Sequence, residues 1–378
     1  MKLRQIILLM VIFCTNFFSG QETNENEKEF YSYHSLDLGY ANTGISFGNS
    51  KSWNGIRFNV IDDGINEING INFTFWQPED FSGSEINGLA IGVAPAAGDI
   101  NGVAVGLGNI VDYNIYGINL GLLVSVAGGD MAGLNFGTLA LVAESEINGL
   151  NFGGLAQVSE RGITGINVGG LALVSQGSIT GISFGGLALV SEGDITGINI
   201  GGLALVSEGN MTGIKVGGLA LVSEGEMLGI NLGGLALVAQ EEIYGFNFGG
   251  LAVVSYGEIK GINIGGLTVT SSSGIMGLNF TLGKLMTDGE LKGLNFGGYK
   301  TEAFEATGLN VSVGWTEIYT LNGFSFAGYN KITGEQNGLT IGIVNFAEFL
   351  NGIQIGLINI AENNPAPFKI LPIINANL

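Results

Sequence analysis

The chain has 378 residues and a net charge of −20, from 13 Lys and Arg against 33 Asp and Glu, with one His and one Cys. This acidity argues against nucleic-acid binding, which needs clustered Lys and Arg, and against simple adsorption to anionic lipid. Glycine is frequent, at 66 residues, but only five Pro and no Gly-x-y triplet period are present, so collagen is excluded. Apolar residues make up 46%, which excludes a disordered Gly-rich linker.

The first 20 residues have the pattern of a signal peptide. A basic start precedes the apolar run Ile6–Phe13, which is too short for a membrane-spanning helix, and a polar leader follows at 21–29. The only cysteine, Cys14, lies inside this segment after a bulky residue, which disfavours lipidation. We therefore expect export from the cytoplasm, and a mature chain without disulfides or thiol chemistry.

A short repeat fills most of the rest of the chain. A Gly followed by an apolar–x–apolar triplet occurs 20 times, with the triplets beginning from Ile56 to Ile353. Between Ile118 and Leu294 the spacing is 16 residues without exception, and elsewhere it is 14 to 18. Such self-similarity indicates a repeat architecture. The predicted parts are a signal peptide at 1–20, a polar leader at 21–29, N-terminal strands or a cap at 30–55, a repeat domain at 56–364 and a C-terminal strand or cap at 365–378.

One copy, GINIGGLALVSEGNM at 197–211, predicts two short strands and two turns. Ile198 and Ile200 flank Asn199 in strand alternation, so we expect both Ile on the core face and Asn199 on the other face. The pair Gly201-Gly202 is expected to turn the chain through positive φ. The residues expected to stack on their equivalents in neighbouring copies are Ile198, Ile200, Leu203 and Leu205.

Two all-β architectures fit this repeat. In a β-solenoid each 16-residue copy is one coil, whereas in an outer-membrane β-barrel each copy is one spanning strand with a turn. An up-and-down barrel would alternate its turns every two copies, but the Ser-Glu-Gly turn recurs at 16-residue spacing with no 32-residue alternation. A 20-stranded barrel also favours a charged lumen, whereas the charges here lie mostly in turns. The sequence therefore favours the solenoid, with the barrel as the alternative.

The recurring GLNFGG and GINIGG units and the C-terminal stretch NGIQIGLINIAENNPAPFKILPIINANL resemble the leptospiral-type bacterial surface-repeat family of secreted and outer-membrane proteins. The resemblance covers the chain from about Ile56 to its end and implies a bacterial cell-surface or outer-membrane protein. The family brings no catalytic residues that could be assigned here. Its members often end in an aromatic residue, whereas this chain ends in Leu378.

The acidic turns are the best chemical candidates in the sequence. At coil spacing they would form a ladder of carboxylates, and a divalent cation with oxygen ligands would relieve their repulsion. The hypothesis is a weak calcium site; the alternative is a solvated acidic edge that prevents aggregation, which the lack of a Gly-Gly-x-Gly-x-Asp motif favours. The candidate ligands are Glu192, Asp194, Glu208, Glu224, Glu226, Glu241, Glu242 and Glu258.

An asparagine recurs between the two apolar residues of the first strand, and stacked amides can form a hydrogen-bonded ladder. Ser183 and Lys215 interrupt this column, and a Lys there implies that the column is solvent-exposed. We interpret the column as structural, with a polar binding face as the alternative. Its members are Asn119, Asn135, Asn151, Asn167, Asn199, Asn231, Asn247, Asn263, Asn279 and Asn295.

Aromatic residues gather where the repeat becomes irregular, and their alternation favours a core or lipid-facing position over an exposed platform for sugars or partners. The only His, His34, lies near the leader, so no Ser–His or metal–His constellation can form. We therefore expect no enzyme and no cofactor. The predicted function is a non-enzymatic surface repeat protein that presents an extended β surface to an unknown partner or the outer membrane; the alternative is a barrel acting as a pore or anchor. The aromatic residues are Tyr299, Phe304, Trp315, Tyr319, Phe324, Phe326 and Tyr329.

Overall fold

The computed structural model describes residues 35–77 and 81–377, and this part of the chain is all β with no helix. The chain divides into two units, Met1–Gly186 and Leu187–Leu378, and each is a β-solenoid. The predicted signal peptide, the polar leader, the first residues of the predicted N-terminal cap and His34 lie outside the described residues, as does Leu378.

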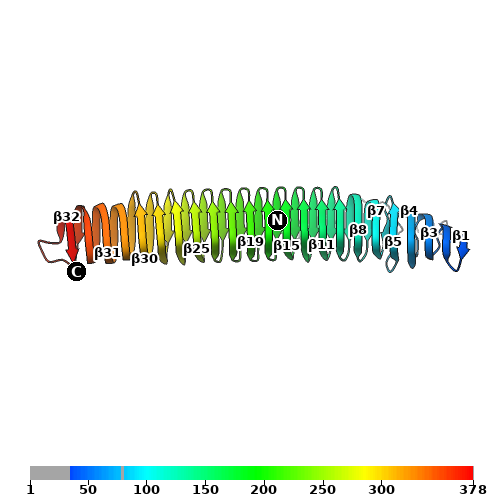
Figure 1. Cartoon of the computed structure of the whole chain (residues 1–378), viewed down its shortest axis with the longest axis horizontal. Helices are drawn as coiled ribbons and strands as arrows, with labels where there is room; N and C mark the ends of the chain where they lie inside the picture. Colours follow the sequence, from blue (N-terminus) through cyan, green and yellow to red (C-terminus); the bar gives the residue numbers. More distant parts are fainter. Residues whose placement is uncertain (1–34, 78–80, 378) are drawn as a thin grey trace, which may run out of the picture. The chain divides into compact units, whose positions relative to one another are not determined.

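Unit 1 begins with long, irregular coils and continues with regular ones in which a long and a short strand alternate (Figure 1). In the regular coils, each strand pairs in parallel with the strand one coil later; in β11 and β13, Gly149 faces Gly165 and Asn151 faces Asn167. The strands are β1 (Ser35–Tyr40), β2 (Thr43–Gly48), β3 (Ser52–Ile61), β4 (Glu67–Trp76), β5 (Glu85–Gly92), β6 (Ala96–Ala97), β7 (Asp99–Val111), β8 (Ile115–Ala127), β9 (Met131–Gly137), β10 (Ala140–Ala143), β11 (Glu146–Gly153), β12 (Ala156–Ser159), β13 (Gly162–Gly169), β14 (Ala172–Ser175) and β15 (Ser178–Gly185).

Unit 2 repeats the same pairing in its regular coils and ends in longer strands. The long strand β17 pairs in parallel with β19, and the short strand β18 with β20, so each residue faces the one 16 positions later. The strands are β16 (Ala188–Ser191), β17 (Ile195–Gly201), β18 (Ala204–Ser207), β19 (Met211–Gly217), β20 (Ala220–Ser223), β21 (Met227–Gly233), β22 (Ala236–Ala239), β23 (Ile243–Gly249), β24 (Ala252–Ser255), β25 (Glu258–Gly265), β26 (Thr268–Ser271), β27 (Gly274–Thr281), β28 (Lys284–Thr287), β29 (Glu290–Gly297), β30 (Lys300–Ser312), β31 (Trp315–Ala361) and β32 (Ile370–Asn377).

This pairing confirms the predicted solenoid and shows that the alternative fold, a barrel with one spanning strand per repeat, is wrong. Neighbouring strands of an up-and-down barrel run antiparallel, whereas consecutive coils here pair parallel and in register. Antiparallel pairing occurs only at the two ends of the described chain, between β1 and β2 and between β31 and β32. At these ends the chain reverses direction and the repeat stops.

The prediction of which strand face is buried was wrong. Asn199 is 0% exposed, whereas Ile198, on the predicted core face, is 41% exposed. The four residues expected to stack on their equivalents in the next coil do so, but Leu203 is also exposed, at 47%, and only Leu205 among them is fully buried. The coil interior instead holds Leu205 with residues such as Met211, while the large apolar residues beside the Gly-Gly corner point outward.

The predicted role of the Gly-Gly pair was wrong in its detail as well. Positive φ occurs at the glycine in the middle of the long strand, as at Gly213 (φ +107), and not at the Gly-Gly corner. A Cβ at Gly213 would lie 2.2 Å from the carbonyl oxygen of Gly197. The corner needs glycine for close approach: a Cβ at Gly201 would lie 2.0 Å from the Ala204 oxygen, and one at Gly218 would lie 1.8 Å from the Gly202 oxygen. The glycines therefore allow the backbones to pack closely within and between coils.

Candidate functional site

The structure brings the eight predicted acidic residues to one edge of unit 2: seven lie in the turns that lead from a short strand to the next long strand, and Glu258 is the first residue of β25. At one turn position, the side-chain oxygen accepts a hydrogen bond from the backbone N–H of the equivalent residue in the next coil. Asp194 Oδ1 accepts a hydrogen bond from the backbone N–H of Asn210 at 2.8 Å, and Asn210 Oδ1 accepts one from the N–H of Glu226 at 2.9 Å. These groups therefore stabilise the turns.

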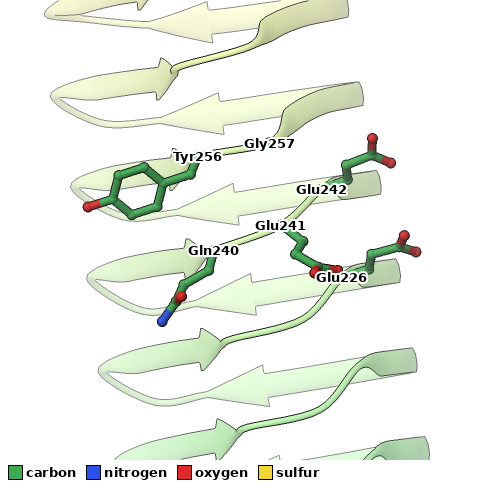
Figure 2. Close-up of a pocket in the computed structure, with 6 residues that line it drawn as sticks. All are labelled: Glu226, Gln240, Glu241, Glu242, Tyr256 and Gly257. Atoms are coloured by element: carbon green, nitrogen blue, oxygen red, sulfur yellow. The ribbon is translucent and has the colours of Figure 1, made fainter.

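A shallow hollow of about 330 Å³ lies on this acidic edge, lined by Glu226, Gln240, Glu241, Glu242, Tyr256 and Gly257. In Figure 2 the side chains of Glu226 and Glu242 point one way and those of Gln240 and Tyr256 the other, so the oxygens do not converge on one point. Within residues 35–77 and 81–377, no group of three His, Cys, Asp or Glu side chains could hold a metal ion. The geometry gives the calcium hypothesis no support.

Beside the hollow, the charges pair locally. The Tyr244 hydroxyl donates a hydrogen bond to Glu242, which raises the pKa of that hydroxyl. The Lys260 ammonium pairs with Glu258, which raises the pKa of Lys260, and lies 5.0 Å from the centroid of the Tyr244 ring. Tyr244 and Lys260 are neighbours in one column of the long-strand face. These contacts hold the Tyr244 ring and the Lys260 ammonium side by side on that face.

The asparagine column is structural, as predicted, but it is buried. The Asn231 amide donates to Asn247 Oδ1, Asn247 to Asn263 and Asn263 to Asn279, each at 2.7 Å. Each of these amides thus hydrogen-bonds to the amide one coil away, so these polar side chains can be buried in a narrow interior. Further along, a similar ladder runs on the other side of the coil, through Asn330, Asn345 and Asn359. The sequence analysis did not find this second ladder, because these residues fall outside the repeated triplet.

Lys215 occupies an asparagine position and is fully buried, so the prediction that it marks an exposed face was wrong. Its ammonium donates to the backbone carbonyl of Met211 at 3.0 Å and to that of Leu228. Burial lowers the pKa of Lys215 from 10.5 to about 7. Within the described chain, the amide of the preceding ladder residue, Asn199, has no hydrogen-bond partner. Lys215 therefore interrupts the ladder at a cost in stability.

The outer surface of the coils is apolar in continuous columns. In β17, β19, β21 and β23 the residue after the positive-φ glycine is exposed and stacks on its equivalent in the next coil. A second exposed column consists of the leucines that follow the Gly-Gly corner. Unit 1 carries the same two columns along β9 to β15. In the regular coils of unit 2 their members are Ile198, Ile214, Ile230 and Phe246 in the first column and Leu203, Leu219, Leu235 and Leu251 in the second.

The predicted aromatic cluster lies on the surface of unit 2, so of the two predicted positions, core or lipid-facing, the core position was wrong. Phe304 stacks on Tyr319 with 5.0 Å between the ring centroids, and the rings of Tyr299 and Trp315 have centroids 5.1 Å apart. All seven aromatics except the half-buried Trp315 are exposed. Charged residues lie among them: Glu317 contacts Lys300 at 3.0 Å and Lys331 at 2.7 Å. Hydrogen bonds from Lys331 and Lys300 lower the pKa of Glu317.

A buried charge cluster in unit 1 was missed by the sequence analysis. Arg57 and Asp62 form an ion pair, and both are almost completely buried. Arg57 also donates to Asn72 Oδ1 and Asn49 Oδ1, both at 2.8 Å. Since Arg57 takes the asparagine position of its copy, it is carried into the interior, where it needs a carboxylate partner. Once the asparagine column is known to face inward, that position identifies Arg57 as a buried charge.

No family model, curated protein or solved structure matches the chain. The resemblance to a bacterial surface-repeat family therefore stays a prediction. Over the described ranges, no helix is long and apolar enough to cross a membrane.

Proposed function

We propose that the chain is a non-enzymatic repeat protein of the bacterial cell surface or envelope, exported through its signal peptide, which presents an extended β surface for contact or adhesion. The exposed apolar columns on the regular coils carry the proposal. Isolated exposed apolar side chains are common on soluble proteins, but contiguous apolar patches are typical of interaction sites.

The repeat explains how such a surface is built. Because consecutive coils pair in register, one apolar residue per copy becomes a column running along the unit. The interior of the regular coils is filled by stacked amides and by buried apolar residues such as Leu205 and Met211, and the exterior columns lie outside it. A surface that lies outside the core and yet is apolar in every coil fits a role in contact. The proposal requires no cofactor, metal or nucleic acid.

The test compares adhesion of cells that display the wild-type chain with adhesion of cells that display a column variant. The variant replaces Leu203, Leu219, Leu235 and Leu251 with Ser, and its matched control replaces the acidic-turn residues Glu208 and Glu224 with Gln. We expect wild-type and control cells to clump and to adhere to hydrocarbon-coated surfaces, and column-variant cells to lose both properties. Equal adhesion by all three, with equal display levels and circular dichroism, would refute the proposal.

A further inference from the structure

Four regular coils of unit 2 form an apolar wedge, defined here as residues 198–206, 214–222, 230–238 and 246–254. The long-strand face carries Ile214 and Val216, the edge carries Leu219 and the short-strand face carries Ala220 and Val222; the other three coils carry equivalent apolar residues. The only charged residue in the wedge, Lys215, faces inward. The wedge is therefore apolar on three outward sides, and the acidic turns lie at the fourth.

The depth of the wedge fits within one lipid leaflet. From Ile214 to the end of β19 at Gly217 the strand advances about 10 Å at about 3.3 Å per residue, and the corner at Leu219 follows; this is within the ~15 Å of one leaflet, half of the ~30 Å hydrocarbon core of a bilayer. In the four coils the next outward position toward the acidic turns carries Thr196, Thr212, Leu228 and Tyr244 in register, and the coil that follows the wedge carries Lys260 there. Tyr is enriched at the membrane–water interface, and Lys can extend its ammonium to the headgroups.

The exposed apolar area of the wedge is large enough to bind either a second copy of the chain or a lipid leaflet. Nine large apolar side chains in the wedge are more than a third exposed. At roughly 80 Å² each they present about 700 Å², more than the largest patch of a typical monomer and close to the ~800 Å² per partner of a stable interface. A second copy with flat strand faces would cover one side of the wedge and leave the other sides in water. A lipid leaflet covers all three.

Resting on the proposed function of this surface, we propose that the apolar wedge inserts edge-on into one leaflet of a lipid bilayer, with the Gly-Gly-Leu corners in the acyl chains. The acidic turns stay in water on the opposite edge. Because the acidic turns repel anionic headgroups, the wedge binds zwitterionic lipid more tightly than anionic lipid. Salt screens this repulsion and therefore reduces the difference in affinity. Beyond the wedge, the exposed Lys284 occupies the short-strand face, so the inserted segment ends before β28.

The experiment places an environment-sensitive NBD label at single sites in the full chain. Cys14→Ser removes the only native cysteine, and Leu219→Cys and Glu224→Cys then provide labels at the corner and at the acidic turn of one coil. Each protein is mixed with phosphatidylcholine vesicles with and without doxyl-labelled acyl chains. We expect NBD emission at the Leu219 site to rise at least about threefold and to be quenched by the doxyl lipids, with little change at the Glu224 site.

A flotation assay supplies a second measurement. Replacing Leu203, Leu219, Leu235 and Leu251 with Asn is expected to weaken binding to phosphatidylcholine vesicles at least about 100-fold. The matched control, Glu208→Gln with Glu224→Gln, is expected to bind phosphatidylcholine like wild type and to improve binding to vesicles that contain phosphatidylglycerol. Because the substituted leucines are on the surface, both variants should keep the wild-type thermal unfolding.

Three outcomes overturn the proposal. One is an unchanged Leu219 signal with vesicles; another is equal quenching at both sites. The third is high, concentration-dependent emission at Leu219 without lipid, accompanied by a dimer in analytical ultracentrifugation, which assigns the wedge to a second copy. In each case the adhesion assay separates the two proposals: continued loss of adhesion in the column variant leaves the contact function standing, and no loss removes both.

Discussion

The regular coils from β17 to β24 and the charged coils from β28 to β31 share an interior and differ outside. Both keep a positive-φ glycine in each coil, as at Gly213 and Gly308, and both contain part of the buried amide ladder: Asn231 donates to Asn247 at 2.7 Å and Asn295 to Asn310 at 2.8 Å. On the short-strand face, however, the regular coils carry Ala and Val, whereas the charged coils carry Lys300, which contacts Glu302 and Glu317.

This comparison separates the interior residues, which determine the coil structure, from the exterior residues, which differ between the two regions. The interior is constrained, because a Cβ at the strand glycines would overlap the preceding coil and a buried polar side chain needs a hydrogen-bond partner. The exterior tolerates both apolar columns and ion pairs on one backbone. We infer that folding is encoded inside and partner choice outside, and the following predictions test that division.

The largest effect is expected at the strand glycines. Gly213→Ala and Gly308→Ala each force a Cβ onto a residue of positive φ and to within 2.2 and 2.4 Å of the preceding glycine oxygen. Each should lower the free energy of unfolding by roughly 3 kcal/mol or more, measured by denaturant titration. Gly274→Ala is the control, since its nearest atom is 3.2 Å away and its φ is not positive. Unequal losses at Gly213 and Gly308 would contradict a shared interior.

The next effect is expected in the amide ladder. Asn247→Ala leaves the Asn231 amide with only its 3.4 Å hydrogen bond to the Tyr244 carbonyl and removes the donor to Asn263 Oδ1, and Asn295→Ala removes the acceptor of Asn279 and the donor to Asn310. Each variant should lose about 2–4 kcal/mol of stability. Hydrogen exchange of the adjacent long strands should report the opening locally. The exposed Thr212→Ala serves as control and should change stability by less than about 0.5 kcal/mol.

The sequence alone predicted the all-β class, the 16-residue coil, the solenoid and the Ser-Glu-Gly turn. It did not predict which face of the strand is inside, because two-residue alternation defines two faces without assigning either to the core. Ile198 and Ile200 were placed inside by hydrophobicity. The interior near Gly201 is too narrow for them, and Asn199 belongs to a column whose amides pair only when coils stack in register. Reading Lys215 as a mark of exposure reinforced the error.

Lys215 provides a smaller, pH-dependent test of the ladder. Because its pKa falls from 10.5 to about 7 on folding, the unfolded chain binds the extra proton between these pH values, and wild-type stability should rise with pH across this window. Lys215→Asn restores an amide between Asn199 and Asn231. It should therefore stabilise the protein by about 1–3 kcal/mol at pH 6, with the gain shrinking toward pH 10. Thermal unfolding over this pH range measures it, and a pH-independent gain would exclude titration of a buried Lys215.

The smallest effect is expected on the charged exterior, at Glu317. Its lowered pKa means that its ion pairs stabilise the folded state above the ordinary carboxyl pKa of 4.5, and that this contribution is lost as the pH falls through the folded value. Since the pairs are partly exposed, Glu317→Gln should cost less than about 1 kcal/mol at pH 7, and 1 M salt should remove most of the difference. Denaturant titration at low and high salt measures the loss, with the exposed Glu335→Gln as control. If Glu317→Gln lowered the free energy of unfolding as much as Asn295→Ala, the charged coils would depend on their surface ion pairs for folding. The division between a shared interior and a freely variable exterior would then be wrong for these coils.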